Sequence, residues 1–195
     1  TSHALYQLGC AAADRGAYDL AEQLMTEARS HAEAMGDHFC TTASIYQLGV
    51  IAQGQGNLDR AMACYEEAQL QARAASEHFN IANTLWYQGL IHCARGDLAA
   101  AADALEEAMA MEQALGSLDG AAPFFANFAV LGLAAGLPET ATRLLATATG
   151  VLERRGMAFN LPEHIDYERA RTALVKSLAR LQVASRSQLA GRVGR

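Results

Sequence analysis

Proline, lysine and tryptophan are scarce in this chain of 195 residues, which contains three prolines, one lysine and one tryptophan. Alanine, in contrast, occurs 42 times. Because alanine is the strongest helix former and proline the strongest helix breaker, this composition predicts an all-α protein. Apolar residues make up 51% of the chain and charged residues 18%, which excludes a chain that is disordered throughout.

Motifs of catalysis and metal binding are missing as well. The sequence has no P-loop, no glycine-rich dinucleotide loop and no HExxH motif. His92 and Cys93 are neighbours in sequence, but on a helix they point about 100° apart and do not form a nucleophile–base pair. His38 and His78 recur at the same repeat position, yet two histidines fall short of the three or four ligands of a zinc site. We therefore expect no enzymatic activity, no metal and no other cofactor.

The four cysteines are few and widely separated. Cys10, Cys40, Cys64 and Cys93 form no CxxC pair and no zinc-ligand spacing. A secreted disulfide scaffold has a higher density of cysteine, so this pattern indicates buried free thiols in a reducing cytosol. The N-terminus shows no basic-then-apolar leader, and the chain starts at Thr1 without a methionine. We predict a cytoplasmic fragment of a longer protein.

Negative charge is concentrated in the first three quarters of the chain. Residues 1–150 carry 17 acidic and 6 basic side chains, whereas residues 151–195 carry 4 and 9. The acidic balance excludes a general nucleic-acid binder, so we expect no direct nucleic-acid contact. The uncharged stretch 120–138 is near the lower limit for a membrane span. Because it contains Pro123, Asn127 and several glycines and shares the repeat of the rest of the chain, we interpret it as a core helix, with no membrane role.

A gapless repeat of 40 residues organises the sequence. The segment Tyr6-Gln7-Leu8-Gly9 recurs as Tyr46-Gln47-Leu48-Gly49. The same shift aligns five further columns of small or large residues: Gly9, Gly49, Gly89 and Ala129; Gly16, Gly56, Gly96 and Gly136; Ala21, Ala61, Ala101 and Ala141; Ala28, Ala68, Ala108 and Ala148; and Met25, Tyr65, Leu105 and Leu145. The column that begins with Gly16 fits the left-handed position that ends a helix. The other small columns indicate close approach of two helices, and the large column fills the space around them.

Each repeat is therefore predicted to be a helix, a tight turn and a second, antiparallel helix, and stacked copies bury a continuous core. The predicted helices cover residues 2–14, 18–34, 38–54, 58–75, 78–94, 98–115, 119–135, 138–155 and 162–181. The predicted domains are repeats at 1–36, 37–76, 77–116 and 117–156, the last of them degenerate, then a capping helix at 157–183 and a flexible tail at 184–195.

The order of large residue, Leu and Gly, then Ala, large residue and Ala, resembles the tetratricopeptide repeat (TPR). Leu5, Leu8 and Gly9 carry the first half of this pattern, and Ala21-Met25-Ala28 the second. The period of 40 exceeds the usual 34 and is similar to a long-helix variant found in bacterial signalling proteins. The resemblance implies an α-solenoid of four TPR-like repeats in a right-handed superhelix, with a C-terminal capping helix.

A narrower resemblance rests on Gly36-Asp37, Gly56-Asn57, Gly96-Asp97 and the segments 141–146 and 163–170. These are similar to the C-terminal helical sensor region of MalT-like and LuxR-type large ATP-binding bacterial regulators. The resemblance implies a non-catalytic scaffold for protein–protein interaction that senses a partner. A receptor that binds a small-molecule inducer in its groove is the alternative.

The TPR resemblance also implies a partner-binding groove lined by first-helix positions. In this chain the groove residues are Tyr6, Gln7, Tyr46, Gln47, Val50, Gln53, Trp86, Tyr87, Leu90, Cys93 and Asn127. None is a cation, which disfavours the carboxylate clamp that binds acidic C-terminal tails. An aromatic and apolar stripe suits an amphipathic peptide or a partly apolar small molecule. The alternative that Tyr6, Tyr46 and Trp86 only pack between repeats remains open.

Two dipeptides recur with the 40-residue period, a His-Phe pair and a Glu-Glu pair. We interpret His38-Phe39 and His78-Phe79 as inter-repeat packing or helix starts. Glu66-Glu67 and Glu106-Glu107 are interpreted as a solvated helix face. The acidic array as a whole favours a partner that is apolar on one face and basic on another.

Overall fold

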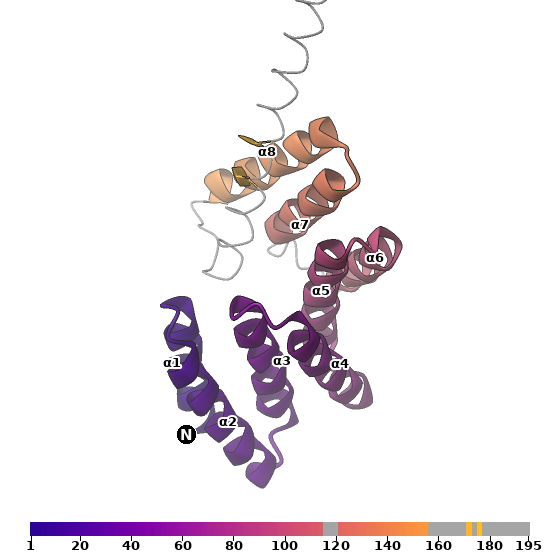
Figure 1. Cartoon of the computed structure of the whole chain (residues 1–195). Helices are drawn as coiled ribbons and strands as arrows, with labels where there is room; N and C mark the ends of the chain where they lie inside the picture. The colour runs from indigo at the N-terminus through magenta and orange to yellow at the C-terminus, as the bar shows by residue number, and fades with distance from the viewer. Residues whose placement is uncertain (115–120, 156–170, 173–174, 177–195) are drawn as a thin grey trace, which may run out of the picture. The chain divides into compact units, whose positions relative to one another are not determined.

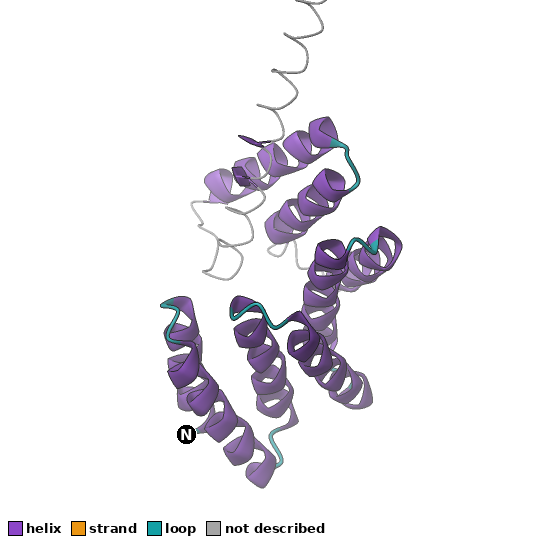
Figure 2. Ribbon diagram, viewed as in Figure 1, coloured by secondary structure: helices purple, strands orange, loops and turns teal. Residues whose placement is uncertain are grey.

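The computed structural model describes residues 1–114, 121–155, 171–172 and 175–176, and its ordered elements are all α-helices (Figures 1 and 2). The helices are α1 Ser2–Asp14, α2 Tyr18–Met35, α3 His38–Gly54, α4 Leu58–Ala75, α5 His78–Arg95, α6 Leu98–Ala114, α7 Ala121–Ala134 and α8 Pro138–Arg155. These bounds agree with the predicted ones to within two residues. Apart from four helical positions between 171 and 176, the predicted ninth helix and tail lie outside the described residues.

The chain divides into two compact units, Thr1–Leu118 and Asp119–Arg195. In the first unit α1 packs on α2, α3 on α4 and α5 on α6, while α2 on α3 and α4 on α5 link successive pairs. In the second unit α7 packs on α8 as a further pair. Stacked helix pairs of this kind confirm the predicted all-α solenoid of TPR-like repeats. None of the helices in the described part of the chain is long and apolar enough to span a membrane.

The turn inside each helix pair depends on a glycine with a left-handed backbone. Gly16, Gly56, Gly96 and Gly136 have φ angles of 74°, 82°, 80° and 74°. Side chains of L residues are strained in this region, whereas glycine adopts it freely. In the second pair the N–H of Gly56 donates to the carbonyl of Gln53, and the N–H of Asn57 to the carbonyl of Ala52. The predicted helix-ending role of this column is confirmed.

Ser76 is a strained counterpart of Gly36 in the turns between pairs. Gly36 has a φ of 68°, and Ser76 has a φ of 57°, the one positive φ of a non-glycine residue among those the structure describes. Since the left-handed region is costly for L residues, we expect Ser76→Gly to raise the free energy of unfolding by about 0.5–1 kcal/mol. Urea denaturation followed by circular dichroism measures this. Ser76→Ala keeps the Cβ and should not stabilise, so an equal gain in both variants would contradict backbone strain as the cause.

In each helix pair of the first unit, a glycine of the first helix contacts a large side chain of the second helix. The contacts pair Gly9 with Met25, Gly49 with Tyr65 and Gly89 with Leu105. A Cβ at Gly49 would lie 2.5 Å from Tyr65 Cε1, which is inside the distance that any real contact allows. The alanines of both small columns have no exposed surface, namely Ala21, Ala61, Ala101, Ala141, Ala28, Ala68, Ala108 and Ala148. The small columns therefore mark the predicted close approach of helices.

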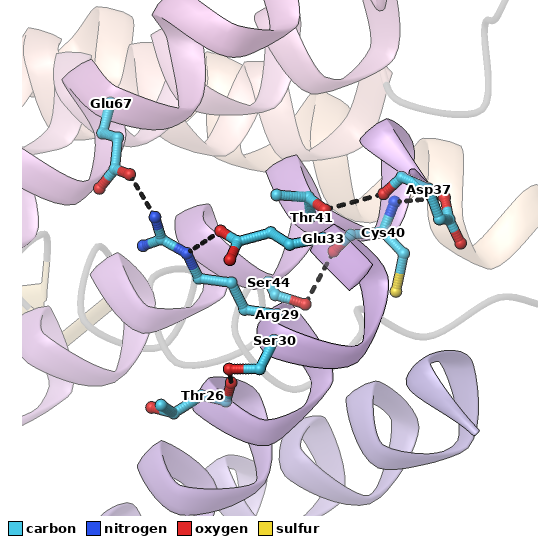
Figure 3. Close-up of polar contacts among 9 residues, drawn as sticks. All are labelled: Thr26, Arg29, Ser30, Glu33, Asp37, Cys40, Thr41, Ser44 and Glu67. Carbon is cyan, nitrogen blue, oxygen red and sulfur yellow. Dashed lines mark hydrogen bonds and ion pairs between the residues drawn. The ribbon is translucent and has the colours of Figure 1, made fainter. Parts of the chain in front are cut away.

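Ion pairs connect the second helices of neighbouring pairs. Arg29 of α2 donates to Glu67 of α4 at 2.7 Å and also to Glu33 on its own helix (Figure 3). Arg73 of α4 donates in the same way to Glu107 of α6 at 2.6 Å. The glutamates remain about half exposed, as a solvated face requires, but their pairing between repeats was not predicted. Exposed pairs contribute about 0–1 kcal/mol each, so they help to set the register between pairs more than the stability.

Candidate partner-binding surface

Three half-buried tyrosines form a continuous row across the first helices of the first unit, and we call Tyr6, Tyr46 and Tyr87 the aromatic row. The hydroxyl groups of Tyr6 on α1 and Tyr46 on α3 are hydrogen-bonded at 3.0 Å. The ring of Tyr46 stacks on that of Tyr87 on α5, with centroids 6.3 Å apart and an interplanar angle of 23°. The row therefore joins three successive repeats through side chains that each keep some surface in solvent.

Further rings extend and support the aromatic row. His3 stacks on Tyr6 at 6.4 Å at one end, and Trp86 contacts Tyr87 at 5.9 Å at the other. Tyr65 of α4 is fully buried and stacks on Tyr87 at 5.3 Å. These contacts immobilise Tyr87, and a rigid aromatic surface loses little conformational entropy when a partner binds.

The predicted groove residues occupy three different environments. Tyr6, Tyr46, Tyr87, Val50 and Gln53 are half-buried and Gln7 is exposed, whereas Gln47, Trp86, Leu90, Cys93 and Asn127 are buried. The structure brings the three tyrosines together with Trp86. Trp86 is only 8% exposed, so it offers a partner little surface and supports Tyr87 instead. Asn127 lies on α7, in the second unit.

Residues 2–190 match the family of MalT-like TPR regions. The chain belongs to this family. Among solved structures, it is similar to a Podosopora anserina protein with nearly identical TPR-like repeats, at 16% identity and a TM-score of 0.59 over 94% of this chain and 95% of that one. A variant of the same protein aligns at 15% identity and a TM-score of 0.60, with 95% of both chains covered. At these identities the likeness establishes the fold alone. No curated protein matches this chain.

Burial keeps titratable groups on the first helices of this MalT-like TPR region in their protonated, neutral form. Burial raises the pKa of Tyr6, and its hydrogen bond to Tyr46 acts in the same direction. Burial also raises the pKa of the Cys10 thiol, and that of Cys93, to about 11. Both thiols stay protonated at neutral pH and are weak nucleophiles, because the thiolate is the reactive form. Within the described ranges, no three His, Cys, Asp or Glu side chains gather as metal ligands would.

Tyr65 and Gln53 illustrate what sequence reasoning missed at this surface. The Tyr65 hydroxyl donates to Gln53 Oε1 at 2.9 Å, so a residue of the second helix orients one of the predicted groove residues. Tyr65 shares its column with Met25 and Leu105, which identified it as core but not as a support of the row. The hydroxyl group of Tyr65 could have indicated this role, because a buried hydroxyl needs a hydrogen-bond partner and the other residues in the column of the first three repeats have none.

Proposed function

We propose that this MalT-like TPR region binds an amphipathic helix or peptide of a partner protein along the aromatic row. A TPR-like repeat array is a protein-interaction scaffold, and the row is the observation that supports this particular surface. Tyrosine is enriched at interfaces because its ring provides a large apolar contact while its hydroxyl forms hydrogen bonds. The half-buried state of Tyr6, Tyr46 and Tyr87 leaves them both anchored and accessible.

Charge around the row favours a partner with basic residues. Residues 1–118 carry 15 acidic and 5 basic side chains. Such a field accelerates association with a cationic partner, and the acceleration decreases as salt screens the charges. We propose that the partner helix is apolar toward the row and basic on its flanks, and that the chain is the sensor part of a larger bacterial regulator.

Selection of peptides tests this proposal. A phage-displayed peptide library is selected on the intact chain, and the enriched peptides are titrated against Tyr46→Ala. We expect at least tenfold weaker binding, because this change removes the ring that joins Tyr6 to Tyr87. Tyr18→Ala is the matched control, since Tyr18 is also half-buried but packs against Gly54 outside the row. Binding should survive in this control.

Two outcomes would argue against peptide binding on the row. Peptides that bind wild type and Tyr46→Ala equally would place the interaction elsewhere. A thermal-shift screen of metabolites is run on the same variants. A metabolite that stabilises wild type but not Tyr46→Ala, in the absence of peptide binding, would favour the small-molecule receptor instead.

A further inference from the structure

Two phenylalanines form an exposed apolar surface outside the aromatic row, and we call Phe39 and Phe79 the turn patch. Phe39 and Phe79 are 52% and 51% exposed, and their rings stack with centroids 6.4 Å apart and an interplanar angle of 28°. Met35, the last residue of α2, is 72% exposed and precedes Phe39 by four residues. Paired exposed aromatic rings indicate an interaction site more strongly than a scattered apolar residue does.

Phe39 and Phe79 lie at the opposite ends of α3 and α5 from the left-handed glycines Gly56 and Gly96. Phe39 is the second residue of α3 and precedes Tyr46 by seven residues, which places it about 10 Å further along the helix axis. Phe79 has the same place on α5 and precedes Tyr87 by eight residues. The turn patch and the aromatic row are therefore two sets of rings about 10 Å apart along the same helices.

Both phenylalanines lie in the first turn of a helix, directly before a buried residue. Asp37 Oδ1 accepts a hydrogen bond from the N–H of Cys40 at 3.0 Å and so caps α3 (Figure 3). In α5 the equivalent Glu77 accepts a hydrogen bond from the Asn80 side chain at 2.8 Å. Cys40 and Asn80, each one residue after a phenylalanine, are buried. The backbone is thus held in place while each phenyl ring remains in solvent.

The charges beside the turn patch are negative. Asp37 and Glu77 each precede a phenylalanine by two residues, and the segments 30–42 and 74–82 contain no lysine or arginine. The nearest arginines in sequence, Arg29 and Arg73, are engaged in ion pairs with Glu67 and Glu107. An apolar platform with acidic edges is complementary to an apolar side chain flanked by cations. An arginine guanidinium also stacks favourably on a phenyl ring.

We propose that the turn patch is a second docking surface, which binds a basic amphipathic helix of a partner protein. The apolar side of that helix covers the stacked rings of Phe39 and Phe79. Its arginine or lysine side chains lie next to the carboxylates of Asp37 and Glu77. Its rings are about 10 Å from those of the aromatic row along α3 and α5, so separate substitutions test the two surfaces.

Two fluorescent peptides of 18 residues test the proposal by anisotropy with the full chain carrying Tyr46→Ala, which interrupts the aromatic row. One carries leucine on one helix face and arginine on its flanks, and the other replaces every arginine by glutamate. We expect the basic peptide alone to bind, and Phe39→Ser with Phe79→Ser to weaken its binding at least tenfold. The matched control is Leu20→Ser with Leu70→Ser, which removes apolar side chains of 51% and 73% exposure elsewhere.

Charge variants separate the acidic edges from the general acidity of the chain. Asp37→Asn with Glu77→Gln should weaken the basic peptide several-fold and reduce its salt dependence. Glu66→Gln with Glu106→Gln removes the same charge from exposed positions and should leave binding unchanged. All these titrations are made in the Tyr46→Ala background, where the aromatic row is interrupted, so that binding to the row does not contribute and the two tests stay separate.

Three results would overturn the proposal. The first is unchanged peptide binding by the double phenylalanine variant, whose fold is verified by circular dichroism and melting. The second is equal loss of binding in both pairs of charge variants, which would indicate attraction to the whole acidic chain. The third is a wild-type dimer in sedimentation that the phenylalanine changes convert to monomer, which would make the turn patch an interface between copies of this chain.

Discussion

Replacing Tyr65 by alanine is expected to lower the free energy of unfolding by about 3–5 kcal/mol, the range for large buried aromatic side chains. Tyr65 is fully buried, stacks on Tyr87 and donates its hydroxyl to Gln53. Its removal leaves a cavity between α3 and α4 and takes away the support of one end of the aromatic row. Urea denaturation measures the stability, and titration of selected peptides measures the effect on binding.

A double-mutant cycle with Gly49 tests whether the ring and the glycine are matched. Gly49→Ala alone should cost about 1–3 kcal/mol, because the new Cβ would lie 2.5 Å from Tyr65 Cε1. In the Tyr65→Ala background the same change meets no ring and gains the higher helix propensity of alanine, about 1 kcal/mol. The double variant should therefore be more stable than the sum of the single changes predicts.

Gly132 provides the matched control for this cycle. A Cβ at Gly132 would lie 3.5 Å from Ala141 Cβ, which is an ordinary van der Waals distance. Gly132→Ala should be neutral or stabilising, since it adds helix propensity without a clash. Additive effects of Gly49→Ala and Tyr65→Ala would contradict the inferred contact between them.

The fold could be predicted from the sequence because the same close contact between a glycine and a large side chain recurs in successive repeats. A glycine 16 residues before a large side chain occurs in three successive repeats, and in each the structure places the two in contact. A single glycine in a helix has many explanations, but three in register indicate close helix packing. The helix bounds followed for the same reason, since the left-handed glycines and the capping residues recur with the period.

The repeat period says where residues are equivalent but not which of them face solvent. Tyr46 and Trp86 share a column, yet Tyr46 is half-buried and Trp86 is only 8% exposed. Phe39 and Phe79 were predicted either to pack between repeats or to lie at helix starts; they lie in the first turns of α3 and α5, and their rings stack on each other while about half exposed. Exposure depends on how neighbouring helices are offset, and a one-dimensional pattern does not contain that offset.

The ion pairs between second helices escaped prediction for a related reason. Arg29 and Glu67 are 38 residues apart, and Arg73 and Glu107 are 34 apart, so neither pair follows the 40-residue period. The glutamates form a column, whereas their arginine partners occupy different positions in successive repeats. A long flexible arginine reaches the same carboxylate from either position, which leaves no periodic signal in the sequence.

Ala101→Leu is expected to destabilise the chain by about 1–3 kcal/mol through overpacking. Ala101 has no exposed surface, and its carbonyl oxygen lies 3.4 Å from the position of a Cβ on Gly89, so the backbones of α5 and α6 are close together. The larger leucine side chain has no space there and must push the two helices apart.

Ala99→Leu is the matched control, because Ala99 is exposed on the same helix and the change should stay within about 0.5 kcal/mol. A melting temperature unchanged by Ala101→Leu would contradict the close approach of α5 and α6. Since α5 also carries Tyr87, its displacement should weaken peptides that bind the aromatic row. Peptides on the turn patch provide a second measurement on the same variant. Phe79 is on α5 and stacks on Phe39 of α3, so a displacement of α5 should disturb this stacking and weaken these peptides as well.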